Sequence, residues 1–87
     1  AISGSRAEES PEEAVLEKER RGILDNAISC LSAEHKDVLI LREYQQYSYD
    51  EIAKILDVSE GTVKSRINRA KVRLREILKE QNPEFFV

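Results

Sequence analysis

Apolar residues recur with the period of an α-helix along most of this chain, and the clearest pattern lies between Ser48 and Leu74. It falls into two short segments separated by the tripeptide Asp57-Val58-Ser59. The apolar positions are Ile52, Ala53, Ile55 and Leu56 in the first segment and Val63, Ile67, Ala70 and Leu74 in the second. At about 100° per residue, the second set lies within about 40° of Val63, as one buried helix face requires. The pattern predicts two helices joined by a tight turn.

Serine residues mark where these two helices begin. Ser48 is followed three residues later by Glu51, the spacing of a capping box in which each side chain bonds the backbone N–H of the other residue. Ser59 can accept a hydrogen bond from the free N–H groups of the helix that follows it. Two helices, a three-residue turn and a polar, basic outer face on the second helix are the parts of a helix-turn-helix that reads DNA.

Two further helices are predicted upstream. Residues 10–13 (SPEE) place a capping serine, a proline at the first helical position and two acids near the positive end of the helix dipole, and this helix should run to about Cys30. Ser32 should cap a second helix over about Ala33–Gln45. The apolar positions are Leu16, Ile23, Leu24, Ala27, Ile28 and Leu31 in the first of these helices and Val38, Leu39, Leu41 and Tyr44 in the second. The chain is therefore expected to be an all-α, small four-helix domain with a C-terminal helix-turn-helix.

The two ends of the chain are expected to lie outside this domain. Residues 1–10 are interpreted as a disordered linker or a leftover of cloning, residues 11–80 as the folded domain and residues 81–87 as a flexible tail. Asn82-Pro83 should end the last helix, because proline cannot continue it. That leaves Phe85-Phe86-Val87 either disordered or available as a small docking element.

Composition narrows the class of protein. Eighty-seven residues allow one small domain, and 36% charged residues with only three glycines and two prolines suit helices. No apolar run approaches the roughly 20 residues that span a membrane, and no signal peptide is visible. The single cysteine, Cys30, excludes an internal disulfide and any multi-cysteine zinc site, and it is expected to be a small core residue. A cytoplasmic protein without membrane contact fits these features.

No arrangement of residues indicates catalysis, a metal or a cofactor. The chain has one histidine, no His/Cys/carboxylate cluster at ligand spacing, no glycine-rich phosphate loop and no serine placed beside a base. We therefore expect no catalytic residue, no metal site and no cofactor. An enzyme is the class that the sequence favours least.

The outer face of the helix after Ser59 carries the candidate chemistry. Opposite the core face lie Gly61, Ser65, Asn68, Arg69 and Val72, flanked by Thr62 and Lys64. Small residues let a helix enter the major groove, while Arg69 can bond a guanine and Asn68 an adenine. A merely solvated helix face would look similar, but no acidic residue occurs from Gly61 to Arg75, and this favours DNA.

Charge is divided unevenly along the chain. Residues 1–60 contain 7 basic and 14 acidic residues, a balance of −7, whereas residues 61–87 contain 7 basic and 3 acidic residues, a balance of +4. Phosphate neutralisation supplies most of the affinity of a protein that binds DNA on its own. The division therefore predicts weak, salt-sensitive DNA binding by this domain, with the affinity completed by a partner.

The segment LREYQQYSYDEIAKILDVSEGTVKSRINRAKVRLRE resembles the fourth conserved region of bacterial sigma-70-family sigma factors, and its spelling is most similar to the extracytoplasmic-function group. The resemblance covers about Pro11 to Lys79, and its densest motif is GTVKSRINRAKVRLR. It implies recognition of the −35 element of double-stranded promoter DNA by a sigma factor that directs core RNA polymerase to promoters in transcription initiation. It also implies an apolar groove for the flap of the polymerase β subunit and, in many members, an anti-sigma factor that covers this region.

The helix wheel and the resemblance together nominate eight DNA-binding residues. Ser65, Asn68 and Arg69 are expected near bases, and Lys64 at a base or a phosphate. Thr62, Arg66, Lys71 and Arg42 are expected to hold the DNA backbone. Arg42 enters this set because the resemblance implies DNA contact by the arginine of the L-R-E segment.

Two other functions stay open at this point. Response-regulator and quorum-type output domains share the shorter pattern E-I-A…G-T-V-K and usually dimerise through their last helix, which Ile77 and Leu78 extend here. A stable dimer would favour that class. The other function is a protein-interaction module, for instance one bound by an anti-sigma factor, in which the partner covers the basic helix. A lack of sequence preference even on polymerase would favour this module.

Overall fold

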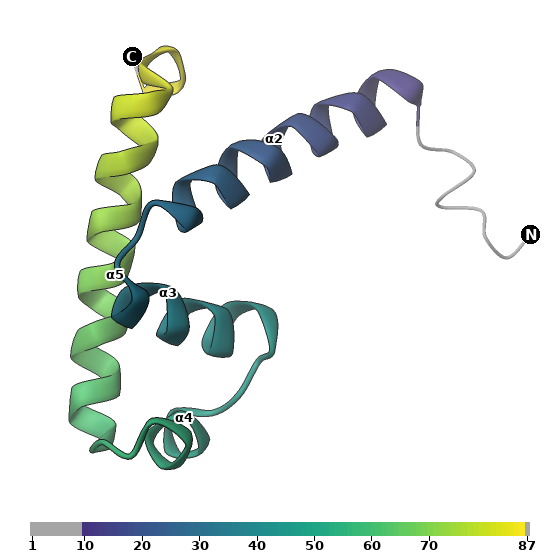
Figure 1. The fold of residues 1–87 in the computed structure, drawn as a ribbon. Coiled ribbons are helices and arrows are strands. Elements are labelled where there is room, and N and C mark those ends of the chain that lie inside the picture. The colour runs from purple at the N-terminus through teal and green to yellow at the C-terminus, as the bar shows by residue number, and fades with distance from the viewer. Residues whose placement is uncertain (1–9, 87) are drawn as a thin grey trace, which may run out of the picture.

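The structure is a computed structural model that describes residues 10–86. Its helices are α2 (Pro11–Ser29), α3 (Ala33–Leu39), α4 (Tyr49–Leu56) and α5 (Glu60–Gln81), with a π-helical turn at Ile40–Tyr44 and a 3-10 turn at Pro83–Phe86 (Figure 1). The described part of the chain contains no strand, so the predicted all-α, four-helix fold with a C-terminal helix-turn-helix is confirmed. Most of the linker expected at residues 1–10 lies outside the described residues.

Side-chain caps explain why the four helices begin where they do. The hydroxyls of Ser10 and Ser48 accept hydrogen bonds from the backbone N–H groups of Glu13 and Glu51 at 3.0 and 3.1 Å. The carboxylates of Glu13 and Glu51 in turn accept from the backbone N–H groups of Ser10 and Ser48, so both capping boxes are complete. Ser32 and Ser59 cap α3 and α5 through single bonds of the same kind. A serine oxygen at this position satisfies an N–H group that has no partner inside the helix.

The apolar interior consists of two clusters of buried residues. The HTH cluster joins α3, α4 and the first half of α5, and its buried members are Val38, Ile52, Ala53, Val63 and Ile67. The α2 cluster joins the end of α2 to α3 and the second half of α5, and its buried members are Ala27, Ile28, Leu31, Leu39, Ala70 and Ile77. Figure 1 shows α5 running the length of the molecule, with α4 at its beginning and α3 against its middle. Helices α3 and α5 therefore take part in both clusters.

Four residues expected in the core are exposed. Leu16 is 49% exposed because the first half of α2 extends away from the other helices (Figure 1). Ile55 is 52% exposed because the buried face of α4 is centred between Ile52 and Ala53, which turns Ile55 outward. Tyr44 is 53% exposed, and Cys30 is also exposed, at the residue that ends α2, where its sulfur accepts a 3.4 Å bond from the Gln81 side chain.

The second predicted helix, Ala33–Gln45, changes its winding partway. From Ile40 the backbone adopts a π-helical turn, closed by a bond from the Gln45 N–H to the Ile40 carbonyl, and Gln46 then takes a positive φ of 61°. A π-helical turn is wider than an α-helix and rotates the side chains that follow it. The Tyr44 side chain accordingly lies beside α2, where its hydroxyl donates to Asp25 at 3.4 Å.

The last helix ends where the sequence predicted. Helix α5 stops at Gln81, and the N–H of Asn82 bonds the Leu78 carbonyl at 2.8 Å before Pro83 opens the 3-10 turn. Within the described range, no helix is both long enough and apolar enough to cross a membrane.

Two isoleucines of α4 provide a matched test of this core. Ile52→Ala should lower the free energy of unfolding by about 2–5 kcal/mol, because Ile52 is fully buried and its truncation leaves a cavity. Ile55→Ala, three residues away and half exposed, should change it by about 0.5 kcal/mol or less. Urea denaturation followed by circular dichroism measures both values, and equal losses would contradict the assignment of the buried face.

Candidate nucleic-acid interface

The turn between α4 and α5 sets the angle between these two helices. Asp57 ends α4 in the left-handed conformation (φ 58°, ψ 51°), and its N–H and that of Val58 bond the Ala53 carbonyl. Aspartate adopts this conformation more readily than most residues other than glycine. Val58 packs against the HTH cluster, and Ser59 starts the next helix. The predicted Asp57-Val58-Ser59 turn is therefore confirmed.

Three of the eight nominated residues are exposed on α5 and, within residues 10–86, have no side-chain hydrogen bond or ion pair. Lys64, Asn68 and Arg69 project from the outer side of the helix. Among the described residues, none of the three has a carboxylate within 4.0 Å or a side-chain hydrogen bond. Their donors and acceptors are thus free to bond an external ligand, as base edges in a major groove require.

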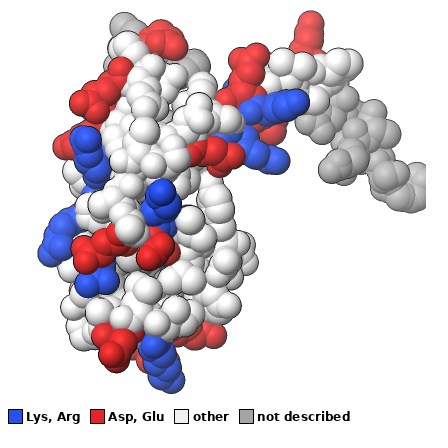
Figure 2. Space-filling model, in the orientation of Figure 1, with Lys and Arg blue, Asp and Glu red and all other residues white. Residues whose placement is uncertain are grey.

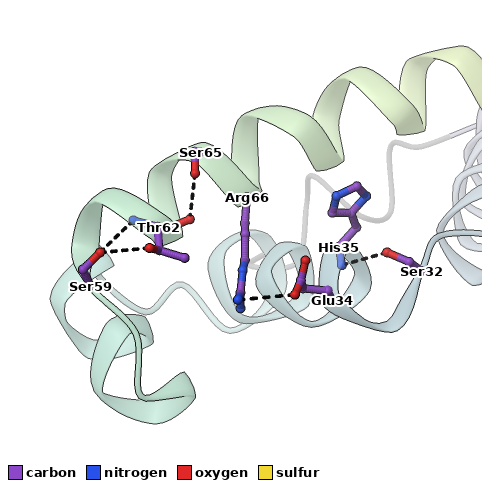
Figure 3. A network of polar contacts seen from close by, with 7 residues as sticks. All are labelled: Ser32, Glu34, His35, Ser59, Thr62, Ser65 and Arg66. Carbon is purple, nitrogen blue, oxygen red and sulfur yellow. Dashed lines mark hydrogen bonds and ion pairs between the residues drawn. The ribbon is translucent and has the colours of Figure 1, made fainter.

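The two nominated hydroxyl residues bond within the first turns of α5. Ser59 accepts from the Thr62 N–H at 3.1 Å and donates to the Thr62 hydroxyl at 2.9 Å, and Ser65 donates to the Thr62 carbonyl at 3.2 Å (Figure 3). Both side chains are short and half-buried against their own helix. Because the Thr62 and Ser65 side chains are small, the backbone at this end of α5 can approach a ligand closely.

Two nominated cations are paired with carboxylates near the two ends of α3. Arg66 points from α5 toward α3 and lies 3.3 Å from Glu34, with 22% of its side chain exposed (Figure 3). Lys71 lies 3.8 Å from Glu43 of the π-helical turn, and both side chains are about half exposed. Figure 2 shows acidic and basic side chains interspersed over the visible face, with no broad basic patch there. Glu34 and Glu43 therefore lower the positive charge along the flanks of α5.

The remaining nominated residue, Arg42, is held by the protein. Its guanidinium donates to the Tyr47 carbonyl at 2.9 Å and lies 4.5 Å from the centre of the Tyr49 ring. The Lys64 ammonium lies 5.7 Å from the centre of the same ring. The fold thus brings Arg42 and Lys64 together around one tyrosine at the first turn of α4.

Sequence reasoning missed three residues of this surface. Glu34 and Glu43 were not connected to α5, because a helix wheel describes one helix and says nothing of acids supplied by its neighbour. Tyr49 was not nominated; it packs against the HTH cluster, and its ring also faces two cations. In the sequence, the only sign of these two contacts was the position of Tyr49, at the start of the helix-turn-helix and between two basic segments.

A groove lies beside this surface, between α2, the π-helical turn and α5. It has a volume of about 330 Å³, and its lining is mainly apolar, with Leu24, Ile28, Leu39, Ile40, Tyr44 and Leu74 joined by Glu43 and Lys71. Partial burial, followed by the charge of Asp25 and the hydrogen bond to it, raises the pKa of the Tyr44 hydroxyl above its ordinary value. From the rim of the groove, this hydroxyl donates to Asp25 of α2 at 3.4 Å.

Over residues 10–86, no group of three or more His, Cys, Asp or Glu side chains is placed to hold a metal ion. The surface consists instead of one capped helix with free polar side chains, a supporting helix and an adjoining apolar groove. This fold and this surface define a helix-turn-helix domain.

Comparisons with known proteins identify the family. The family model described as "Sigma-70, region 4" matches residues 21–74, which contain all eight nominated residues. The chain is 38% identical over 77 residues to an RNA polymerase sigma-E factor of Streptomyces antibioticus, covering 88% of this chain and 41% of that relative. It is 37% identical over 70 residues to an RNA polymerase sigma-H factor of Pseudomonas aeruginosa, covering 80% of this chain and 36% of the relative. It is 42% identical over 62 residues to an ECF RNA polymerase sigma-E factor of Salmonella typhimurium, covering 71% of this chain and 32% of that relative.

This chain belongs to the sigma-70 family, as a region 4 domain. The predicted family is therefore confirmed, and nothing in the comparisons favours the response-regulator or quorum-type class. The chain spans about two fifths or less of the length of these curated relatives.

The cap at Ser59 can be tested apart from any ligand. Ser59→Ala should lower the free energy of unfolding by about 0.5–2 kcal/mol, because the Thr62 N–H loses its acceptor. Ser59→Asp should restore most of this loss, since aspartate is an equally good cap. Chemical denaturation of the three proteins decides the matter, and an alanine variant as stable as the original would contradict the capping role.

Proposed function

We propose that this chain reads the −35 element of promoter DNA as part of a sigma factor that directs core RNA polymerase to promoters. The observation that carries the proposal is the set of exposed side chains of Lys64, Asn68 and Arg69 on α5, which form no hydrogen bond or ion pair within residues 10–86, in a domain of the sigma-70 region 4 family. The relatives it matches are named RNA polymerase sigma factors, which supports a role in transcription initiation. The role is one of recognition, not of catalysis.

In this proposal α5 enters the major groove with its first three turns. Arg69 donates to a guanine, Asn68 bonds an adenine and Ser65 lies beside them, while Lys64 reaches a base or a phosphate. Thr62, Arg66, Lys71 and Arg42 contact the DNA backbone. Lys71 exchanges Glu43 for a phosphate, and this exchange costs little because exposed ion pairs are worth only about 0–1 kcal/mol. Arg66, whose side chain is only 22% exposed, exchanges Glu34 for a phosphate by turning away from α3.

The charge balance explains why the domain needs a partner. The acidic first 60 residues repel DNA, and only the last 27 residues carry a net positive charge. Binding to core RNA polymerase supplies the missing affinity, because a tethered domain meets DNA at a high effective concentration. We place this activity in the cytoplasm, where the polymerase and the promoter meet.

We further propose that the groove between α2 and α5 receives the flap of the polymerase β subunit. Its apolar lining suits an apolar segment of a partner protein, and its polar members, Glu43 and Lys71, lie toward the DNA-facing flank of α5. An anti-sigma factor that covers the same region would compete with polymerase for this surface.

Two α5 variants separate base reading from backbone binding. Arg69→Ala should lose about 1–3 kcal/mol of discrimination at one base pair, because a bidentate contact to one base is removed. Lys71→Ala should weaken binding to all promoter sequences alike, because a phosphate carries no sequence information. Binding of holoenzyme to a panel of −35 variants measures both effects. Equal, sequence-independent losses from the two changes would contradict this division.

The proposed function itself is tested by selection from a randomised −35 window, with the full-length sigma factor bound to core polymerase. A sharp consensus that changes in the Arg69→Ala variant supports base reading by α5. A flat profile, in a domain still needed for polymerase binding, would replace the proposal with a protein-docking role.

The groove assignment has its own test. Ile40→Ser should weaken binding of the full-length sigma factor to core polymerase several-fold, because a half-buried apolar side chain of the groove is lost. Val72→Ser is the matched control, since Val72 is an exposed apolar residue of α5 that does not line this groove. Competition binding in the absence of DNA measures both, after thermal melting has shown that both variants are folded. Equal affinities of the two variants would contradict the assignment.

A further inference from the structure

Tyr49 occupies an unusual place among the residues around α5. It is the first residue of α4, half-buried against the HTH cluster, and its ring lies near both Arg42 of the π-helical turn and Lys64 of α5. These two cations are 22 positions apart in the sequence. Arg42 is fixed a second time by the Tyr47 carbonyl, whereas the Lys64 side chain has no hydrogen bond or ion pair within residues 10–86.

Within residues 10–86, the Tyr49 ring provides the only specific contact that orients the Lys64 side chain. A lysine side chain has four rotatable bonds, and an exposed one loses substantial rotamer entropy when a ligand fixes it. The negative face of an aromatic ring attracts an ammonium group within about 6 Å of the ring centre. At 5.7 Å, the contact restricts Lys64 without removing its donors from solvent.

Resting on the proposed function, we propose that Tyr49 is a positioning residue for base recognition: its ring orients Lys64 at the start of α5, and Arg42 anchors the ring. Arg42 lies nearer to the ring than Lys64 does and is itself held by the Tyr47 carbonyl, so it holds the ring against the π-helical turn. Lys64 then approaches the DNA from a limited set of directions. This makes the preference for the base pair next to Lys64 depend on a tyrosine that need not touch DNA.

The first experiment measures the contact in the free 87-residue chain. A lysine beside an aromatic face has its ε-methylene protons shifted upfield in the NMR spectrum. This shift should be present in the original chain and in Tyr49→Phe, and absent in Tyr49→Leu, which keeps an apolar side chain against the HTH cluster. Unchanged Lys64 resonances in Tyr49→Leu would overturn the proposal.

The second experiment measures base preference with holoenzyme and a panel of −35 variants. Tyr49→Leu should reduce the preference at one base pair by about two- to fivefold, the range of an exposed cation–π contact, and Tyr49→Phe should leave it unchanged. In a Lys64→Ala background, Tyr49→Leu should have no further effect at that base pair, because the two residues act as a unit. Independent effects of the two changes would overturn the proposal. A uniform loss of affinity in Tyr49→Phe would do so as well, since it would make the hydroxyl a direct phosphate donor.

A structural role of Tyr49 is separated from the proposed one by fluorinated phenylalanines at residue 49. Fluorine withdraws electron density from the ring face with little change of shape, so folding is preserved while the attraction to cations falls. The base preference should decrease as the number of fluorine atoms on the ring increases. A preference that stays constant across the series would contradict the proposal. If the original holoenzyme had no preference in the −35 window, the proposed function would fail, and the NMR result would still report on the Tyr49–Lys64 contact.

Discussion

The packing of α3 against α5 is the contact on which the rest of this domain depends. Adjacent residues of α3 enter different clusters, with Val38 beside α4 and Leu39 beside the end of α2. Helix α5 likewise enters both clusters, with Ile67 in the HTH cluster and Ile77 in the α2 cluster. Between them lies Ala70, which has no exposed surface and a small side chain. Because a single helix pair links both clusters, the helix-turn-helix and the end of α2 form one folded unit. The outward direction of each α5 side chain follows from this packing.

The same packing determines the electrostatics of the surface. Helix α3 and its π-helical turn carry Glu34 and Glu43 to the two flanks of α5, where they pair with Arg66 and Lys71. The exposed centre of the face, at Lys64, Asn68 and Arg69, has no such partner within the described residues. A protein with an overall charge of −3 thus offers few free cations to DNA. Since phosphate contacts supply most non-specific affinity, such a surface agrees with the proposed weak binding of DNA by this domain on its own.

Helix α5 and the apolar groove are adjoining surfaces. Glu43 and Lys71 line the groove and also form the ion pair on one flank of α5. A partner seated in the groove therefore lies next to residues proposed to meet the DNA backbone. The two proposed contacts are therefore neighbours on the same helix.

The sequence by itself determined the four helices and where they begin, because caps and apolar periodicity act over three or four residues, but not the π-helical turn that ends the second one. Ser10, Ser48 and Ser59, each at the start of an apolar pattern, were sufficient to place three helix starts, and the motif around GTVKSRINRA was sufficient for the family. Only the tertiary structure decided which apolar residues are buried and which cations are free. Ile55 and Tyr44 turned outward because of how α4 and the π-helical turn pack, and Arg42 turned toward Tyr49 for the same reason. Contacts between distant segments depend on the crossing of helices, and no periodicity within one helix contains that information.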